Sequence, residues 1–397
     1  PLFVVVQSAA KICKICSPFR IPFFPAQIPH IFRPNAPTPW QRLLLQSDHP
    51  ESLSHPIIRG YFLWPKKNRR SFSTTTPGAS RCSTRRSRAL ADFPDEIYSS
   101  KDLDDPALAG LFARTRVIFS SWGMPTLTEA QIAAHFPNLE AVYYAAGTVQ
   151  YFARPFLKRG VRVFSAWAAN GVPVVEFTVA QIVLAGKGYF QSLRRYRERD
   201  RKAAFAYTMS LPCNYNIRVG ILGAGVIGRE VMARLKAYQY EVLAYDPYVS
   251  DEVLSSLGAK RASLEEIFST CQIISNHVAN LPATVGMIDG KLLHSMLPNA
   301  AFINTGRGAQ VVESELIAAL KACPDRTALL DVTWPEPPEE GSEFYTLPNV
   351  FLTPHIAGSQ NNEWARMALY MVEEFERTED HLPVRYEVTE KMLETMA

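Results

Sequence analysis

The stretch 218–246, RVGILGAGVIGREVMARLKAYQYEVLAYD, carries the pattern that decides the fold. An apolar run at 219–222 ends in a glycine-containing turn at 223–228, and an amphipathic run follows the turn. A second apolar run, 242–245, ends at Asp246. Short apolar runs bounded by glycine are typical of buried strands, and the segment between them has helical spacing. The stretch therefore predicts a strand, a tight turn, a helix and a second strand that ends at an acid.

The glycine turn has the residues that a dinucleotide requires. Gly223 permits the tight turn, Gly225 lets the backbone approach a pyrophosphate, and Gly228 lets the helix pack close to the strand. The N–H groups that open the helix, at Val226 and Ile227, offer a partial positive charge to phosphates. A glycine turn that binds nothing is the alternative, because such turns are common.

Asp246 favours the first interpretation and indicates which dinucleotide binds. It lies 18 residues after Gly228, near the usual spacing of an acid that binds both hydroxyls of an NAD ribose. The same carboxylate would repel the additional phosphate of NADP. We therefore expect NAD as the cofactor.

Length and composition limit the classes of protein that remain. The chain has 397 residues, enough for two or three domains, and 47% hydrophobic residues, enough for large cores. An apolar run of about 18 residues without charge or proline is absent, so the sequence predicts no membrane span. Residues 1–90 hold 14 Lys and Arg against 2 Asp and Glu, whereas the rest of the chain holds 28 against 36. The positive net charge of +4 is therefore due to residues 1–90 alone. Because no recognisable motif accompanies these cations, we expect no nucleic-acid binding.

Residues 1–90 differ in composition and hydrophobic pattern from the rest of the chain. They hold 12 of the 29 prolines and show no persistent hydrophobic period, which favours an extension that is disordered or not native to the fold. We expect a cytoplasmic protein. The alternative is a mitochondrial protein, because the Arg- and Ser-rich run at 69–73 is typical of a targeting segment. Cys13 and Cys16 form a CxxC without a second pair, and the other four cysteines are scattered, so we expect no metal site and a reducing compartment.

From residue 91 onward, strands alternate with helices, which predicts parallel sheets covered on both faces. A first α/β unit occupies 91–170, and a long helical stretch at 173–197 leads to the glycine turn. Six parallel strands are expected from Arg218 onward, and one amphipathic helix at 362–377 ends the chain.

Reactive side chains follow three of these predicted strands. Arg307 follows one strand, Asp331 and Glu336 follow the next, and His355 follows the last. In such sheets, ligands bind outside the carboxyl ends of the strands. Oxidation of a 2-hydroxy acid requires a base, and His is suited to this role near neutral pH. It also requires a cation for the carboxylate, and the planar guanidinium of Arg can donate two hydrogen bonds to a carboxylate. Taken singly, each residue is more typical of an ordinary surface loop, but their common position favours function.

Glu336 and Asp331 would assist these two residues. A Glu hydrogen-bonded to the second ring nitrogen of His355 would hold the ring and favour its protonated form. Asp331, nearer its strand end, would accept a hydrogen bond from the nicotinamide carboxamide.

The chain from about residue 91 to residue 397 resembles the D-isomer-specific 2-hydroxyacid dehydrogenases, which include glyoxylate/hydroxypyruvate reductases and phosphoglycerate dehydrogenases. The resemblance depends on GAGVIG with Asp246, INTGRG, LDVTWPEP and TPHIAG, in this order. It implies that Arg307, Glu336 and His355 are the catalytic residues. His355 would protonate the carbonyl oxygen during reduction, Arg307 would bind the 2-oxo acid, and Glu336 would tune His355. Related formate dehydrogenases carry Gln at the Glu336 position.

The resemblance also implies the fold and the remaining contacts. A Rossmann-type doubly wound parallel sheet at 171–356 would bind NAD and be inserted into a smaller flavodoxin-like α/β substrate domain, formed by 91–170 and 357–397. Family members are commonly dimers through the long helical stretch. The resemblance implies substrate contacts at Ala146, Gly147 and Thr148, and cofactor contacts at Val278, Thr305 and Gly358.

One departure concerns the strand that normally opens the substrate domain. The residues just before 91 contain no good strand, and Leu2–Val6 would supply one only across a long irregular segment. We therefore expect that this strand is missing or that the sequence before 91 is not native to the fold, which would leave an inactive protein if the damage is severe. The function that we expect is that of an NAD-dependent oxidoreductase acting on the CH–OH group of a small 2-hydroxy acid or on the matching 2-oxo acid. The alternative is an NAD(H)-sensing regulator of the same fold, similar to the corepressors that resemble this family.

Overall fold

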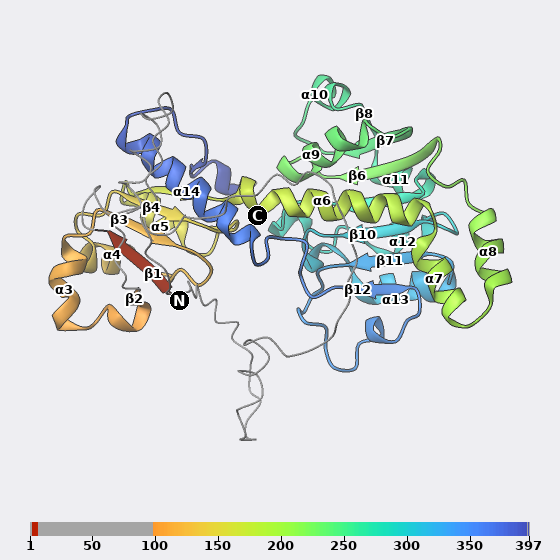
Figure 1. Cartoon of the computed structure of the whole chain (residues 1–397), viewed down its shortest axis with the longest axis horizontal. Helices are drawn as coiled ribbons and strands as arrows, with labels where there is room; N and C mark the ends of the chain where they lie inside the picture. Colours follow the sequence, from red (N-terminus) through yellow and green to blue (C-terminus); the bar gives the residue numbers. More distant parts are fainter. Residues whose placement is uncertain (1, 7–97, 395, 397) are drawn as a thin grey trace, which may run out of the picture.

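The chain forms two α/β units that lie beside each other (Figure 1). The computed structural model describes residues 2–6, 98–394 and 396. The targeting interpretation of 69–73 and the Cys13–Cys16 pair lie outside these residues. Among the residues described, no group of three or more His, Cys, Asp or Glu is arranged to hold a metal ion.

The larger unit contains a parallel sheet of seven strands in the order β12-β11-β10-β9-β6-β7-β8. The strands are β6 (Ile217–Leu222), β7 (Tyr240–Tyr245), β8 (Ala259–Arg261), β9 (Ile273–Asn276), β10 (Ala301–Asn304), β11 (Thr327–Leu330) and β12 (Val350–Leu352). The expectation of six strands was wrong by one, because β8 is a three-residue edge strand whose Lys260 and Arg261 are exposed. Such a short polar strand has no hydrophobic pattern to reveal it.

Helices cover both faces of this sheet, which is why its central strands are apolar on both sides. Ile221, Ile273 and Ile303 are buried against one face, where α6 (Trp167–Gly186) and α9 (Val226–Leu235) pack. Ile274 and Phe302 are buried against the other face. The helices of that second face are α11 (Leu264–Thr270), α12 (Gly290–Ser295) and α13 (Glu313–Ala322), and α10 (Asp251–Ser256) follows β7. The predicted Rossmann-type sheet is confirmed.

The long helical stretch expected at 173–197 is divided in two. α6 ends at Gly186, and α7 (Tyr189–Arg197) begins after Gly188, which has a φ of +66°. A side chain at position 188 would meet Leu211 at 2.3 Å, so the break depends on glycine. A further helix, α8 (Arg201–Met209), was not predicted.

By length and composition alone, α6 is apolar enough to span a membrane. The sequence criterion did not select it, because that criterion requires a run without charge or proline and α6 contains Glu176 and Pro173. Its Val175 and Ile182 are buried in the core of the larger unit. These contacts are those of a core helix packed on a sheet.

The smaller unit contains a mixed sheet in the order β13-β5-β4-β3-β1-β2. The strands are β1 (Leu2–Val6), β2 (Tyr98–Ser99), β3 (Val117–Ser120), β4 (Ala141–Tyr144), β5 (Arg162–Ser165) and β13 (Glu387–Val388). β3, β4 and β5 are parallel, whereas β1 is antiparallel to β3 and β13 is antiparallel to β5.

The expectation that the opening strand is missing was wrong. β1 pairs with β3 from Phe3↔Ser120 to Val6↔Val117, and β2 pairs with β1 on its other side. The pairing satisfies the N–H and C=O groups that an open edge of β3 would otherwise expose. β-Branched and aromatic residues such as those of β1 suit this position.

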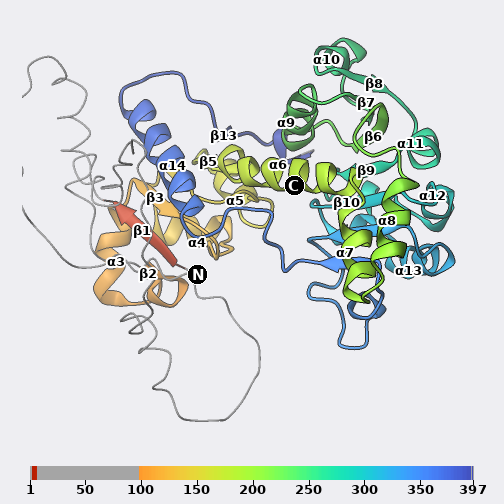
Figure 2. The same cartoon turned by 45° about the vertical axis from the view of Figure 1, so that its right-hand side comes forward.

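The helices of the smaller unit also lie on both faces of its sheet. One face carries α3 (Pro106–Ala113), α4 (Glu129–His135) and α5 (Ala153–Lys158), and the other face carries α14 (Glu363–Glu379). α6 and the segment before α14 connect the two units, as Figure 2 shows. Five short 3-10 helices complete the described elements: η3 (Ser100–Asp102), η4 (Pro282–Thr284), η5 (Gly308–Gln310), η6 (Glu343–Tyr345) and η7 (Met392–Glu394).

Candidate active site

The strand order of the larger sheet places a crevice beside the glycine turn. The order of strands reverses between β6 and β9, which are neighbours in the sheet. Ligands bind outside the carboxyl ends of the strands at such a switch point. The glycine turn follows β6, and the loops that carry Arg307, Glu336 and His355 follow β10, β11 and β12 at the same edge.

The three glycines of the turn have distinct surroundings. Gly223 has a φ of +88°, and a Cβ there would lie 2.7 Å from the carbonyl oxygen of His277. A Cβ on Gly228 would lie 2.0 Å from the carbonyl oxygen of Gly223. In contrast, a Cβ on Gly225 would meet nothing within 4 Å. Gly223 and Gly228 therefore close the turn, and Gly225 faces open space.

The residues around Gly225 fit a dinucleotide. α9 starts directly after Gly225 and has no side-chain cap, so the N–H groups of its first turn point toward the open space. Val226 is 49% exposed, and Tyr248, just beyond β7, is 80% exposed. Apolar surface beside uncapped N–H groups is what a nucleotide requires, with its phosphates at the helix and its rings against side chains.

The Asp246 carboxylate is nearly buried and orders the backbone around it. One oxygen accepts from the N–H of Ala224 at 2.7 Å, and the other accepts from the N–H groups of Tyr248 and Val249 at 2.8 and 3.1 Å. The acid predicted to bind the ribose thus also joins the glycine turn to the loop after β7.

His277 and Val278 follow β9 on the opposite side of the crevice. The N–H of Val278 donates to the Asn276 side chain, and its carbonyl accepts from Gln310 at 2.7 Å. The Nε2 atom of His277 lies 2.9 Å from the hydroxyl of Ser275. Burial lowers the pKa of His277 to about 4, so its ring is neutral at physiological pH.

A buried network of amide side chains supports the Arg307 loop. Asn276 donates to Asn304 at 3.0 Å and to Gln310 at 2.7 Å, and Asn304 donates to the carbonyl oxygen of Arg307 at 3.0 Å. The sequence reasoning missed Asn304 and Gln310. Polar residues at the last position of apolar strands, as in Ile273–Asn276 and Ala301–Asn304, were the available signal.

Arg307 connects the two units. Its Nη2 donates to the hydroxyl of Thr148 at 3.2 Å, and its Nη1 donates to the carbonyl of Gly306 at 2.8 Å. Burial lowers the pKa of Arg307, and the nearby Glu336 charge raises it, but an arginine remains protonated at neutral pH. A fixed cation therefore lies beside the loop that contains Thr148, where a carboxylate was predicted to bind.

His355 and Glu336 form a hydrogen-bonded pair. The Nδ1 atom of His355 lies 2.7 Å from Oε1 of Glu336. His355 has a φ of +54°, a conformation that non-glycine residues seldom adopt and that often marks functional residues. Because Nδ1 faces Glu336, Nε2 is the nitrogen that a substrate can reach.

Asp331 supports the loop that carries His355, and its predicted contact with the nicotinamide stays a prediction. Its carboxylate is 2% exposed and accepts from the hydroxyl of Thr353 at 2.6 Å. It also accepts from the N–H groups of Ile356 and Ala357 at 2.8 and 2.9 Å. These bonds use both oxygens, and we interpret Asp331 as the residue that holds the His355 loop.

The remaining predicted residues lie where the two units join. The hydroxyl of Ser165 donates to the carbonyls of Ala146 and Gly147 at 2.9 and 2.6 Å. The Asn170 side chain accepts from the N–H of Ser359 at 3.0 Å. Gly147 and Gly358 both lie beside this side chain, since a Cβ on either would be 3.4 Å from the Asn170 amide. On the cofactor side, the hydroxyl of Thr305 lies 3.2 Å from that of Thr178 in α6.

A sheet with a glycine turn at its switch point and an acid after the next strand defines a dinucleotide-binding α/β protein. Residues 180–357 match the model of the D-isomer specific 2-hydroxyacid dehydrogenase, NAD binding domain. The chain is 29% identical over 263 residues to D-3-phosphoglycerate dehydrogenase of Archaeoglobus fulgidus, covering 66% of this chain and 49% of that protein. It is 33% identical over 206 residues to D-3-phosphoglycerate dehydrogenase of Methanocaldococcus jannaschii, covering 51% of this chain and 38% of that protein.

Solved structures have the same fold. D-mandelate dehydrogenase of Rhodotorula graminis matches with a TM-score of 0.62 at 21% identity, over 70% of this chain and 84% of that chain. Formate dehydrogenase of Granulicella matches with a TM-score of 0.57 at 25% identity, over 69% of this chain and 74% of that chain. Residues 180–357 are therefore similar to the NAD-binding domain of the D-isomer specific 2-hydroxyacid dehydrogenases, and the solved structures share the fold of the chain. The chain spans half or less of the length of the two phosphoglycerate dehydrogenases.

Two glycine substitutions test the turn as the cofactor site. Gly225→Ala should leave the melting temperature of the free protein nearly unchanged, because the new methyl group enters open space. NADH affinity should fall about tenfold or more, because the methyl group occupies the approach of the pyrophosphate. Gly228→Ala should lower the melting temperature strongly, because its Cβ would overlap the Gly223 carbonyl. Calorimetry and NADH titration measure both effects, and wild-type NADH affinity in Gly225→Ala would contradict the assignment.

Proposed function

We propose that the protein is an NAD-dependent oxidoreductase that interconverts small 2-oxo acids and D-2-hydroxy acids, acting on the CH–OH group. The observation that supports this most directly is the 2.7 Å pair of His355 and Glu336, at the sheet edge where Arg307 also lies. An acid–base pair beside a fixed cation is what a 2-oxo acid requires for reduction at its carbonyl.

The residues divide the reaction between them. NADH bound at the glycine turn would supply the hydride. Arg307 binds the substrate carboxylate, together with backbone N–H groups of the loop at 146–148. The Nε2 atom of His355 gives its proton to the carbonyl oxygen during reduction and removes the proton from the hydroxyl during oxidation. Glu336 accepts from Nδ1, which fixes the orientation of the ring.

The His355–Glu336 pair favours this reaction over the oxidation of formate. Hydride loss from formate gives carbon dioxide directly and transfers no proton to or from an oxygen, so it has no use for a His–carboxylate pair. Reduction of a 2-oxo acid forms a hydroxyl and needs a proton donor. Glu336, at 2.7 Å from the His355 ring, therefore favours a 2-oxo acid as substrate.

The activity is tested by a panel of 2-oxo acids of different size and charge, assayed with NADH. Turnover of at least one acid is expected. His355→Ala should lower kcat about 10²–10⁴-fold because the proton donor is lost. NADH affinity should stay within a factor of about two, since His355 lies outside the glycine turn. Tight NADH binding without turnover of any acid would favour a regulator that senses the dinucleotide.

Cofactor choice is tested at Asp246. The carboxylate accepts three backbone N–H groups, so Asp246→Ala would disturb the fold as well as the ribose site. Asp246→Asn keeps an acceptor oxygen and removes the charge. It should reduce the preference for NADH over NADPH about tenfold or more, because the repulsion of the 2′-phosphate is lost. Kinetics with both cofactors give the ratio, and an unchanged ratio would exclude Asp246 as the discriminating residue.

We propose a homodimer formed through α7 and α8 as the state of the protein in solution. Tyr196, Phe205 and Met209 are 58%, 59% and 68% exposed on these helices, and Tyr189 is 46% exposed at the start of α7. Several large apolar side chains exposed close together are typical of interaction sites.

Light scattering should therefore give the mass of a dimer for the wild type. Phe205→Glu should give a monomer with an unchanged circular dichroism spectrum, because it places a charge in the apolar contact. The same substitution at Tyr248, which is exposed on a different part of the larger unit, serves as the control. A monomeric wild type would overturn the proposal.

A further inference from the structure

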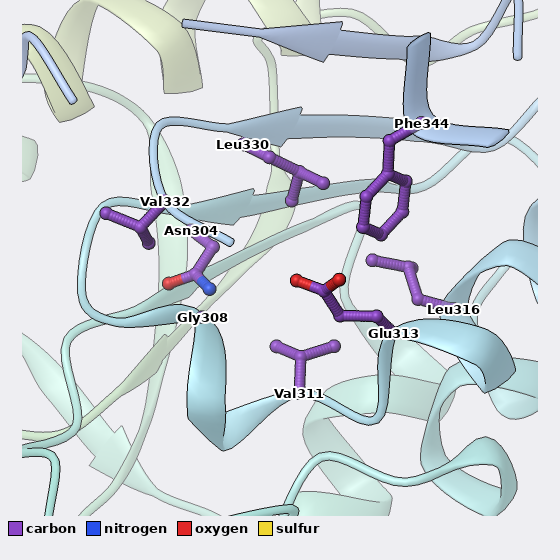
Figure 3. Close-up of a pocket in the computed structure, with 8 residues that line it drawn as sticks. All are labelled: Asn304, Gly308, Val311, Glu313, Leu316, Leu330, Val332 and Phe344. Atoms are coloured by element: carbon purple, nitrogen blue, oxygen red, sulfur yellow. The ribbon is translucent and has the colours of Figure 1, made fainter. Parts of the chain in front are cut away.

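A carboxylate points into an apolar recess beneath the loops that carry Arg307 and Glu336. Figure 3 shows the side chain of Glu313 directed into this recess, with apolar side chains around it. These are Val311, Leu316, Leu330, Val332 and Phe344, and Asn304 and Gly308 complete the lining. Glu313 is the first residue of α13, and the reaction described above does not use it.

An acid in such surroundings is unfavourable unless a hydrogen bond compensates it. Burial raises the pKa of Glu313, and a hydrogen bond from Trp334 acts in the opposite direction. The bond joins the backbone N–H of Trp334 to Oε1 of Glu313 at 2.6 Å. The carboxylate is therefore held in the recess by the backbone of a neighbouring loop.

That loop is the one that presents Glu336 to His355. Trp334 lies two residues before Glu336, and the turn between them is closed by a hydrogen bond from the Thr333 hydroxyl to the Pro335 carbonyl at 2.8 Å. The position of the Glu336 carboxylate thus depends on where the N–H of Trp334 is held.

The Arg307 loop meets the same segment. A Cβ on Gly308 would lie 2.0 Å from the carbonyl carbon of Thr333, so the two backbones touch at this point. The chain then continues through η5 into α13, where Glu313 makes the hydrogen bond to Trp334. Glu313 is a second attachment between the loop that binds the substrate carboxylate and the loop that supports the proton donor.

We propose that Glu313 is a positioning residue that sets the Glu336 carboxylate against Nδ1 of His355. This inference rests on the proposed function, because it assigns Glu313 a part in the same proton transfer. Removal of the acceptor releases the N–H of Trp334, and Glu336 then loses its alignment with the ring.

Three variants separate the acceptor from the charge and from the helix. Glu313→Ala removes the acceptor and should lower kcat about 10–100-fold, with KM for the 2-oxo acid and NADH affinity within about threefold of wild type. Glu313→Gln keeps an acceptor oxygen and should retain most of kcat. Glu315→Ala is the matched control, because Glu315 lies on the same helix and also accepts a backbone N–H, from Gly290, away from the catalytic loops.

A double-mutant cycle with Glu336→Gln tests whether Glu313 acts through Glu336. If it does, adding Glu313→Ala to Glu336→Gln should change kcat by no more than about twofold, because the interaction is already lost. If Glu313 only stabilises the fold, the two effects should multiply. Multiplied effects, or wild-type kcat in Glu313→Ala, would overturn the proposal.

An NMR spectrum of the His355 ring gives a readout that does not depend on turnover. Glu313→Ala should shift the Nδ1 resonance of His355 in the same direction as Glu336→Gln, because both substitutions remove the aligned hydrogen bond between Nδ1 and the Glu336 carboxylate. Glu315→Ala should leave this resonance unchanged. A resonance unmoved by Glu313→Ala overturns the positioning role, whereas a moved resonance without turnover of any 2-oxo acid supports it and overturns the proposed reaction.

Discussion

The buried carboxylate of Asp331 is the constraint on which the candidate site depends most. It lies at the end of β11 and accepts from Thr353, Ile356 and Ala357, which surround His355 in the chain. These bonds hold the backbone of His355 at a φ of +54°, since such conformations persist only when neighbouring contacts enforce them. A buried carboxylate is itself costly, and the same N–H and O–H donors that fix the loop compensate it. The local structure that supports the acid–base pair is thus one hydrogen-bonded unit.

Polar side chains at the ends of buried strands support the loop that carries Arg307 in the same way. Asn276 and Asn304 occupy the last positions of β9 and β10, where the apolar interior of the sheet meets the crevice. Asn276 donates to Asn304 and Gln310, and Asn304 donates to the Arg307 carbonyl, so the group is rigid and leaves few polar atoms unsatisfied. The side chain of Arg307 therefore extends from a rigidly held backbone toward Thr148.

The features that follow from local pattern were predictable from the sequence, and those that depend on distant contacts were not. The glycine turn, the apolar strands of the larger sheet and the alignment of Arg307, Glu336 and His355 at one edge follow from periodicity and from the geometry of parallel strands. The pairing of β1 with β3 brings together residues more than 100 positions apart, and nothing near either strand encodes it. The support that Asp331 gives to the His355 loop was not predicted, because it depends on a loop that folds back onto Asp331.

The division of the site between the two units has a consequence for how such a protein changes over evolution. The proposed proton donor, its carboxylate partner and the guanidinium all belong to loops of the larger sheet, whereas the loop at 146–148 belongs to the smaller unit and meets the guanidinium through Thr148. Replacement of residues in the smaller unit can alter which molecule fits beside Arg307 while leaving the reactive groups in place. One NAD-binding unit can thus be retained by descendants with different selectivity, in which the variable part is physically separate from the part that performs the reaction.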